Sequence, residues 1–254
     1  MKFDFENKVA LVTGAGSGLG LATVKAFAQA GASVALADLD ENAVKTAVEE
    51  LTAAGHKAIA IRCNVAIEAD VVAMVEQTIA AFGRLDMAYN NAGIQVTVAE
   101  TADLSGEEFD RAIAVNLKGV FNCLKYELQQ MKKQEGGGAI VNCSSTGGII
   151  GTAGMAAYTA AKHGVIGLTK CAALEYAAKG IHINSICPGV TETPMVSKAV
   201  ADVPEHMAAI MNSIPAQRFA SSEEIAAMVL WLCSEGAGFM IGQAIIVDEG
   251  YTVQ

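Results

Sequence analysis

Positive charge is scarce in this chain. It has 17 lysine and arginine residues against 27 aspartate and glutamate residues, a formal net charge of −10. The basic residues are spread along the chain without a basic block. Nucleic acids and anionic membranes are bound through clustered lysine and arginine, so the composition argues against both as partners.

Long apolar runs and metal-binding cysteine patterns are also lacking. No stretch approaches the roughly 18 apolar residues of a membrane-spanning helix. The first residues, "MKFDFENKVALVTG", have neither the basic start nor the cleavage site of a signal peptide. The six cysteines form no CxxC pair, and none has histidines at metal-ligand spacing. We therefore expect a cytoplasmic protein without a zinc site.

Aromatic residues make up only 6% of the chain, whereas hydrophobic residues as a whole make up 52%. Short apolar runs alternate with amphipathic helical stretches along all 254 residues. The expected strands read KVALVTG, SVALADL, KAIAIRC, LDMAYNN, GAIVNCSS, IHINSICP and QAIIVDEG. The expected helices lie near residues 18–30, 41–54, 67–82, 107–133, 156–179 and 222–234. This alternation predicts a single α/β domain over residues 1–254, with a Rossmann-like, doubly wound parallel sheet of seven strands flanked by helices.

A glycine-rich segment, Thr13–Gly20, follows the first expected strand. Its sequence TGAGSGLG places glycines at 14, 18 and 20, which is not the GxGxxG spacing. The physical effect is similar, since glycine lets backbone approach a pyrophosphate at the start of a helix. A plain glycine turn is the alternative, but the position after the first strand favours a dinucleotide site.

Asp38 ends the second expected strand, 18 residues after Gly20. A carboxylate here can accept hydrogen bonds from ribose hydroxyls and would repel a 2′-phosphate. Ser17 and Leu39 offer no positive charge, and the sequence shows no nearby arginine. We therefore expect NAD rather than NADP. The alternative is that an aspartate here caps the next helix, a role that Asp40 suits better.

Polar residues also follow four later strands. In parallel sheets ligands bind beyond the carboxyl ends of the strands, so these residues are candidates for a site. Taken alone, each would more commonly be an ordinary polar turn. They are Asn64 and Val65, Asn90–Gly93, Ser144 and Ser145, and Pro188–Pro194.

Tyr158 and Lys162 stand four residues apart in the alanine-rich segment YTAAK. On a helix this spacing puts both side chains on one face. A solvated surface pair is the usual meaning of such spacing. Here, however, Ser145 lies thirteen residues earlier at a strand end, and a dinucleotide loop lies upstream. This combination favours catalysis.

Together these segments resemble the short-chain dehydrogenase/reductase family, in its compact form of about 250 residues. The resemblance covers nearly the whole chain and depends on the order and spacing of several motifs. The motifs are TGxxxGxG at Thr13–Gly20, NNAG at Asn90–Gly93, Asn116 in VNLKG, Ser145, YxxxK at Tyr158–Lys162, PG at Pro188–Gly189, and the C-terminal GQAIIVDEG.

The resemblance implies catalytic roles for four residues. Tyr158 would be the general acid/base, exchanging a proton with the substrate oxygen while hydride moves to or from the nicotinamide. Lys162 would favour the phenolate electrostatically and bind the nicotinamide ribose. Ser145 would orient the substrate oxygen, and Asn116 would hold a water in a proton relay behind Lys162.

The resemblance also implies the residues that contact cofactor and substrate. Asn90 would support the central strand, Thr193 would contact the carboxamide, and the segment from 190 to about 214 would form a substrate lid. The cofactor-binding candidates are Gly14, Ser17, Gly18, Leu19, Asp38, Asn64, Val65, Asn90, Ala92, Gly93, Tyr158, Lys162, Pro188, Gly189, Val190 and Thr193. The substrate-binding candidates are Gln95, Ser145, Met155, Tyr158 and Met195.

Two positions depart from the family pattern, and one terminal residue raises the question of a metal. Asn64 stands where many relatives carry aspartate, and Glu249 stands in VDEG where VDGG is common. The family implies a homotetramer and no catalytic metal. Gln254 resembles the terminal residue of relatives that bind Mg²⁺ between subunits, although a solvated tail is the alternative.

The sequence therefore predicts an NAD-dependent oxidoreductase that interconverts a neutral secondary alcohol, cyclic alcohols included, and its ketone. No cluster of basic residues is placed to bind a carboxylate or phosphate of the substrate. Two alternatives stay open. One is a 3-oxoacyl-carrier-protein reductase, against which Asp38 and the acidic net charge count. The other is a dinucleotide-binding regulator without catalysis, which would not need the four catalytic residues.

Overall fold

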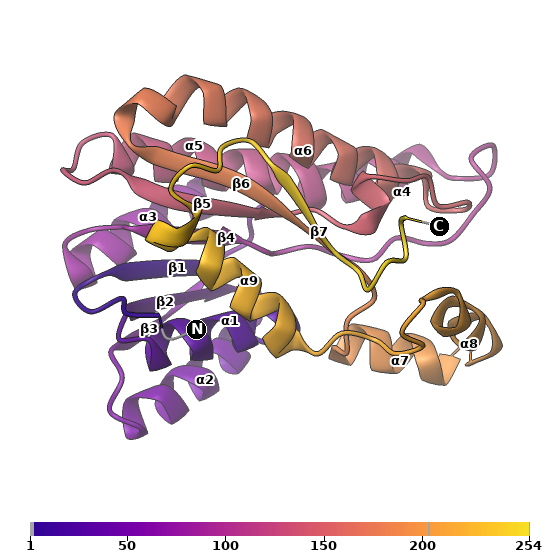
Figure 1. Cartoon of the computed structure of the whole chain (residues 1–254), viewed down its shortest axis with the longest axis horizontal. Helices are drawn as coiled ribbons and strands as arrows, with labels where there is room; N and C mark the ends of the chain where they lie inside the picture. Colours follow the sequence, from indigo (N-terminus) through magenta and orange to yellow (C-terminus); the bar gives the residue numbers. More distant parts are fainter. Residues whose placement is uncertain (1–2, 203, 254) are drawn as a thin grey trace.

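The computed structural model describes residues 3–202 and 204–253, apart from the side chains of Met195, Lys198, Ala199 and His206. It contains a seven-stranded sheet of order β3-β2-β1-β4-β5-β6-β7, in which every neighbouring pair is parallel (Figure 1). The predicted fold class is confirmed. The strands are β1 (Val9–Thr13), β2 (Ser33–Asp38), β3 (Ala58–Arg62), β4 (Met87–Asn90), β5 (Gly138–Cys143), β6 (Ile181–Pro188) and β7 (Ala244–Val247).

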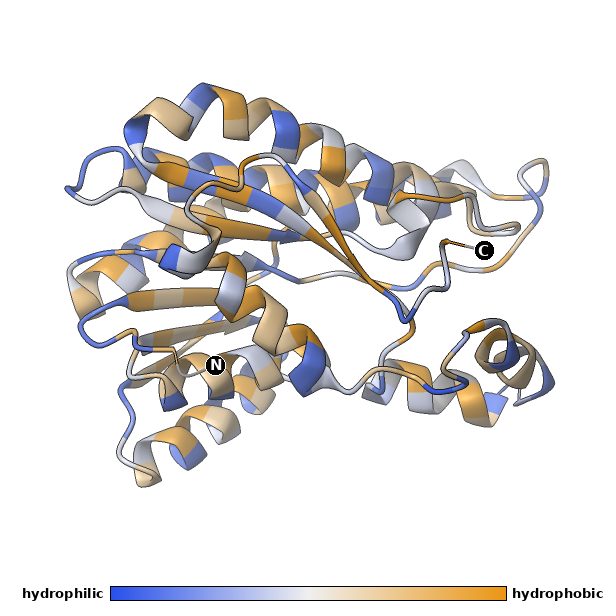
Figure 2. Ribbon diagram, viewed as in Figure 1, coloured by the Kyte–Doolittle hydropathy of each residue, from blue (hydrophilic) through white to orange (hydrophobic). Residues whose placement is uncertain are grey.

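Helices cover both faces of this sheet. On one face α1 (Gly18–Gln29), α2 (Glu41–Ala53) and α9 (Ser222–Leu232) enclose a core that includes Phe27 and Leu36. On the other face α3 (Glu68–Phe82), α5 (Val120–Met131) and α6 (Ala156–Tyr176) enclose a second core. Figure 2 shows the strands between these layers as largely hydrophobic. Burial on both faces explains why the strands read as continuous apolar runs.

The residues at helix ends show how local sequence sets where a helix begins and stops. The Asp40 side chain accepts hydrogen bonds from the backbone N–H groups of Asn42 and Ala43, which have no partner inside the helix. Asp40, and not Asp38, is therefore the helix cap. At the end of α3, Gly83 adopts a φ of 81°, a left-handed conformation that glycine adopts without strain.

The stretch predicted as one helix over 107–133 is three elements. It consists of α4 (Gly106–Ile113), the π-helical segment η1 (Ala114–Gly119) and α5. The π-helical turn contains Asn116. Such wide turns disturb the regular hydrogen-bond ladder and occur often at functional sites, a feature that apolar periodicity does not reveal.

The predicted helical lid over 190–214 is two helices, α7 (Pro194–Asp202) and α8 (Pro204–Ser213). In Figure 1 they project from the sheet beyond the ends of β6 and β7. Proline lacks the N–H that continues a helix and restricts the residue before it, so Pro204 begins a new helix. Over the described residues, no helix combines the length and hydrophobicity needed to cross a membrane.

The strand order reverses direction between β1 and β4. The chain moves outward from β1 to β3, returns to β4 and then continues to β7 on the other side. The loops that follow β1 and β4 therefore leave the sheet next to each other. Such a reversal is where parallel α/β sheets bind their ligands.

Candidate active site

The glycine-rich loop after β1 is hydrogen-bonded to the segment after β4. Asn91 Nδ2 donates to the backbone oxygens of Thr13, at 3.1 Å, and Gly14, at 3.2 Å. The Thr13 hydroxyl accepts from the N–H groups of both Asn91 and Ala92. A Cβ on Gly14 would lie 2.9 Å from Ala92 Cα, so the two backbones require a glycine there. Asn91 and Thr13 lie in the predicted segments Asn90–Gly93 and Thr13–Gly20, but neither was assigned a cofactor contact of its own.

Close backbone approach also explains the other glycines of the loop. A Cβ on Gly20 would lie 2.0 Å from the Gly14 carbonyl oxygen, and one on Gly18 would lie 3.1 Å from Thr193 Cγ2. Ser17 directly precedes α1, without capping it through its side chain, and Leu19 packs against the core. The loop thus presents bare backbone at a helix N-terminus, an arrangement that fits a dinucleotide pyrophosphate.

Asp38 lies beside this loop. Its Oδ2 accepts from Gly16 N at 2.9 Å, and its Oδ1 accepts from Asp40 N at 3.0 Å. The expectation that no arginine lies near Asp38 is incomplete, because Arg62 on β3 is its register partner. The structure shows no ion pair between these two described residues. The Asp38 carboxylate therefore borders the loop without a direct ion pair to Arg62 on the neighbouring strand.

The segment after β3 is held by helix α5. Asn122 Nδ2 donates to the backbone oxygen of Val65 at 2.9 Å, which fixes the loop from within the core. The Asn64 side chain accepts from Ala66 N at 3.1 Å, so this side chain stabilises its own turn. Asn122, a buried amide on a helix face, was missed because a single polar residue in a helical pattern carries no signal of its own.

Lys162 and Asn116 meet behind Gly93. Lys162 is only 4% exposed, and its Nζ donates to the backbone oxygen of Cys143 at 2.8 Å. Asn116 is fully buried, and its carboxamide exchanges two hydrogen bonds with the backbone of Ile94. The position of a Gly93 Cβ lies 3.1 Å from Asn116 Oδ1 and 3.8 Å from Lys162 Nζ. A side chain at this position would crowd the Asn116 carboxamide, so glycine suits the contact between the two side chains.

Ser145 and Tyr158 converge on Gly147. A Cβ on Gly147 would lie 3.4 Å from Tyr158 Cε1 and 3.6 Å from Ser145 Oγ. Gly147 N also donates to Ser145 Oγ at 3.1 Å, within the short helix η2 (Thr146–Gly148). Lys162 Nζ lies 5.6 Å from the centre of the Tyr158 ring. The four predicted catalytic residues are thus brought to one rim of the sheet by η1, β5 and α6.

The remaining candidates lie around this set. Met155 and Tyr158 pack against a small apolar cluster containing Val96, whereas Gln95 is exposed. Pro188 ends β6, Gly189 N donates to Val247 O, and Val190 packs against the lid residues Met207 and Ile214. The Asn90 side chain points away from the rim, into the core. The Met195 side chain and Gln254 lie outside the described residues.

One further observation limits the chemistry available at the rim. Burial raises the pKa of Cys187, at the end of β6, to about 11, so its thiol is neutral and a poor nucleophile near neutrality.

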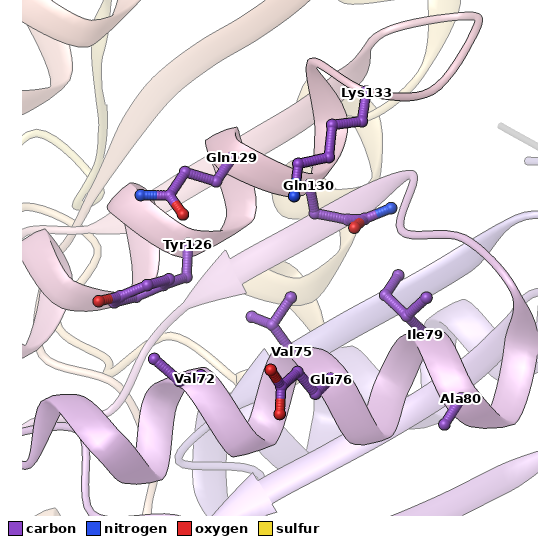
Figure 3. A pocket seen from close by; sticks show the side chains of 9 residues that line it. All are labelled: Val72, Val75, Glu76, Ile79, Ala80, Tyr126, Gln129, Gln130 and Lys133. Carbon is purple, nitrogen blue, oxygen red and sulfur yellow. The ribbon is translucent and has the colours of Figure 1, made fainter.

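A surface groove between α3 and α5 (Figure 3) is lined by side chains such as Val75 and Tyr126, which face each other across it. None of the candidate site residues lines that groove.

Comparisons with known proteins agree with this geometry. The family model described as Enoyl-(Acyl carrier protein) reductase matches residues 14–252. A cyclohexanol dehydrogenase of Acinetobacter sp. (strain SE19) is 45% identical over 252 residues, covering 99% of this chain and 98% of its own. A 2,5-dichloro-2,5-cyclohexadiene-1,4-diol dehydrogenase of Sphingobium indicum is 40% identical, covering 98% of each chain.

A solved structure has the same fold. The crystal structure of a 3-ketoacyl-(acyl-carrier-protein) reductase from Brucella melitensis complexed with NADH superposes with a TM-score of 0.90. Its sequence is 33% identical, and the match covers 98% of this chain and 100% of that one. The chain belongs to the short-chain dehydrogenase/reductase family. As a member, it is an oxidoreductase of alcohol or ketone groups that uses a nicotinamide dinucleotide.

Proposed function

We propose that the protein is an NAD-dependent oxidoreductase that interconverts a neutral secondary alcohol, cyclic alcohols included, and its ketone, with Tyr158 as general acid/base. One observation carries the proposal. The position that a Cβ on Gly147 would occupy lies 3.4 Å from Tyr158 Cε1 and 3.6 Å from Ser145 Oγ, so the tyrosine ring and the serine hydroxyl converge there. A substrate oxygen at this rim could contact both groups, while the Lys162 ammonium lies behind the phenol.

The roles of the side chains follow from this arrangement. Ser145 Oγ donates a hydrogen bond to the substrate oxygen, and the Tyr158 phenolate removes its proton as the C–H bond breaks. When bound, the nicotinamide accepts the hydride. The Lys162 charge favours the phenolate, and its hydrogen bond to Cys143 O keeps the ammonium in place. The two hydrogen bonds between the Asn116 carboxamide and the backbone of Ile94 keep the adjoining loop beside Lys162.

The preference for NAD is part of this proposal. The carboxylate of Asp38 borders the glycine loop and suits ribose hydroxyls better than a 2′-phosphate. Arg62 weakens this inference, because a guanidinium beside Asp38 could bind a phosphate. The NADH complex of the Brucella structure is consistent with NAD as the ligand.

A neutral, cyclic substrate is supported by both the lid and the relatives. Met207 and Ile214 of the lid form an apolar cluster with Phe219, and Met211 packs against it. The two curated relatives described above are named for cyclohexanol and a cyclohexadiene diol. We propose that residues 190–214 close over such a ring, with Met155, Gln95 and Met195 contributing to the pocket.

A carrier-protein reductase is the second candidate, and the Brucella structure is the observation that favours it. An acidic carrier would need a basic docking surface, and this chain has a net charge of −10. A non-catalytic regulator is disfavoured because Asn116, Ser145, Tyr158 and Lys162 are all retained and converge. We further propose a cytoplasmic homotetramer.

The replacement of Tyr158 by phenylalanine tests this function. We expect Tyr158→Phe to lower turnover of cyclohexanol with NAD by at least about a thousandfold, because the proton has no acceptor, and to leave NADH affinity within about twofold. Initial rates and NADH fluorescence titration measure these effects for wild type and variant, with NADP and linear alcohols run alongside.

Tyr176→Phe is the matched control. Tyr176 also lies on α6 and has a lysine, Lys179, 4.4 Å from its ring centre, but it is remote from Ser145. This variant should retain wild-type rates. Full activity in Tyr158→Phe would refute the mechanism, whereas tight NADH binding without turnover of any alcohol would favour the regulator.

A further inference from the structure

A row of polar side chains crosses the interior between the sheet and helices α5 and α6. Glu127, Asn90, Asn142 and Thr169 are each at most 2% exposed. Asn90 Nδ2 donates to Glu127 Oε2 at 2.9 Å and to Asn142 Oδ1 at 3.0 Å. Asn142 Nδ2 donates to Thr169 Oγ1 at 3.0 Å, and Thr169 Oγ1 donates to the backbone of its own helix. We call these four residues the buried polar row.

Each member of the buried polar row belongs to a different element, and each element leads to part of the candidate active site. Helix α5 continues from η1, which holds Asn116, and β4 leads into the loop that holds Gly93. Strand β5 ends two residues before Ser145, and α6 carries Tyr158 and Lys162. The row therefore joins the supports of all four candidate catalytic residues.

Two oxygens of the row have no partner among the described residues. They are Asn90 Oδ1 and Glu127 Oε1, and both atoms are buried. Both are acceptors if Glu127 is ionised, so neither can satisfy the other. A buried carboxylate with one unpaired oxygen is costly, because water no longer solvates its charge.

The surroundings of Glu127 supply no compensating charge. Its side-chain hydrogen-bond partner is the Asn90 amide on β4, beyond which lie the Asn142 amide on β5 and the Thr169 hydroxyl on α6, and it forms no ion pair within the described chain. The thiol of Cys123 on its own helix interacts with it electrostatically, and Cys63 interacts in turn with Cys123. Burial raises the pKa of both thiols, which are therefore neutral. Burial likewise raises the pKa of Glu127 to about 7, and the hydrogen bond from Asn90 offsets only part of this effect.

We propose that Glu127 is a neutral carboxylic acid that pairs with the Asn90 carboxamide through two hydrogen bonds, and that this pair positions the elements carrying the active site. The second bond runs from a proton on Glu127 Oε1 to Asn90 Oδ1. One proton thus gives both unpaired oxygens a partner. Glu127 touches neither substrate nor cofactor, so it is a positioning residue. The catalytic part of this inference rests on the proposed function, whereas the protonation of Glu127 does not.

Glu127→Gln tests the protonation because glutamine reproduces both hydrogen bonds without the ability to ionise. Difference infrared spectra of wild type against Glu127→Gln should show the C=O stretch of a protonated acid at about pH 6, and it should fade as the pH rises to about 9. Absence of that band at about pH 6 overturns the proposal. So does failure of Glu127→Gln to fold, since its amide should fit the pair.

The pH dependence of stability gives an independent result. Because the folded pKa of Glu127 lies above 4.5, the folded state holds its proton more tightly, and this contribution is lost as the pH rises to about 7. Urea titrations should show the folding equilibrium of wild type falling relative to Glu127→Gln by about a hundredfold between about pH 5 and pH 8. Glu49→Gln, at an exposed position in α2, should follow the wild-type curve. Parallel curves for wild type and Glu127→Gln would contradict the inference.

The positioning role is measured separately by kinetics. Glu127→Ala should lower kcat about tenfold, with less than about twofold change in the KM for alcohol, because the catalytic groups are less well aligned. Glu127→Gln should restore kcat, because its amide keeps both hydrogen bonds to Asn90. An unchanged kcat in Glu127→Ala refutes the positioning role. If wild type oxidises no secondary alcohol, the proposed function fails, while the spectra and urea titrations still decide the state of Glu127.

Discussion

At the scale of single residues, two opposite charges at the edge of the sheet bear on the proposed choice of cofactor. Asp38 and Arg62 are register partners on β2 and β3, and no ion pair joins them. The carboxylate favours a free ribose and the guanidinium favours a 2′-phosphate. We propose that the balance between them, and not Asp38 alone, sets the preference between NAD and NADP.

Asp38→Asn should shift that balance toward NADP. The amide oxygen retains one acceptor for the loop but no longer repels a phosphate, so the ratio of NADPH to NADH dissociation constants should fall at least about tenfold. Fluorescence titration with both cofactors measures the ratio. The double variant Asp38→Asn/Arg62→Gln is the control, because it should lose the gained NADPH affinity. No change in the ratio for Asp38→Asn would show that its charge does not select the cofactor.

Sequence reasoning at this scale identified residues whose type reveals their chemistry. Tyr158, Lys162 and Ser145 were predicted from spacing and from a family pattern, and the structure brings them together. That reasoning included Asn91 in the candidate segment Asn90–Gly93 but gave an individual role only to Asn90. Successive residues of a strand point to opposite sides, so one asparagine enters the core and the other reaches the glycine loop. Which one does which depends on the position of α5, which the sequence does not state.

At the scale of elements, the start of α9 shows how a few polar groups fix a helix end. Ser221 Oγ accepts from Glu224 N at 3.2 Å, and Glu224 Oε2 accepts from Ser221 N at 2.8 Å. The same Glu224 is paired with Arg218, which also reaches Glu249. The ion pairs of Arg218 with Glu224 and Glu249 thus join this helix cap, at the base of the lid, to the segment after β7.

Removal of that cap should destabilise the fold modestly. Ser221→Ala loses the acceptor for Glu224 N and should lower the free energy of unfolding by about 1 kcal/mol. Urea denaturation monitored by circular dichroism measures the change. Ser221→Asp is the matched rescue, because aspartate is an equally good cap. Equal losses in both variants would mean that the serine hydroxyl does not stabilise this helix end.

Elements were predictable where periodicity was strong, and less so where it was interrupted. All seven strands were expected because each reads as a short apolar run, although β3 and β7, at the two edges of the sheet, are only partly buried. The π-helical turn at η1 was not expected, since a wide turn leaves the apolar pattern of 107–133 nearly unchanged. The lid was expected as one short helical segment and is two helices, with Pro204 at the start of the second.

At the scale of the whole molecule, large apolar side chains remain exposed on the chain taken alone. Leu174 on α6 is 82% exposed, and Phe239 before β7 is fully exposed. Burial of a leucine side chain is worth about 1.5–3 kcal/mol, so such residues are efficient contacts between subunits. They support the proposed homotetramer through both α6 and the C-terminal region.

Leu174→Glu should therefore weaken assembly. A charge in an apolar contact between copies loses hydration, so sedimentation velocity should show a smaller species than for wild type, with unchanged far-ultraviolet circular dichroism. Thr52→Glu introduces the same charge on an exposed position of α2 and should leave the assembly intact. A wild-type sedimentation coefficient in Leu174→Glu would rule out α6 as a contact between subunits.

The hydrogen bonds from Asn91 to the Thr13 and Gly14 carbonyls also bear on how this enzyme could be divided. The glycine motif lies wholly in the first strand–helix unit, but the amide that holds its backbone comes from β4, across the strand-order reversal. A fragment that ends before β4 would keep every glycine of the motif and lose the support of its loop. The glycine loop is therefore not a transferable module. Grafting it into another scaffold would also require the segment after β4 that carries Asn91.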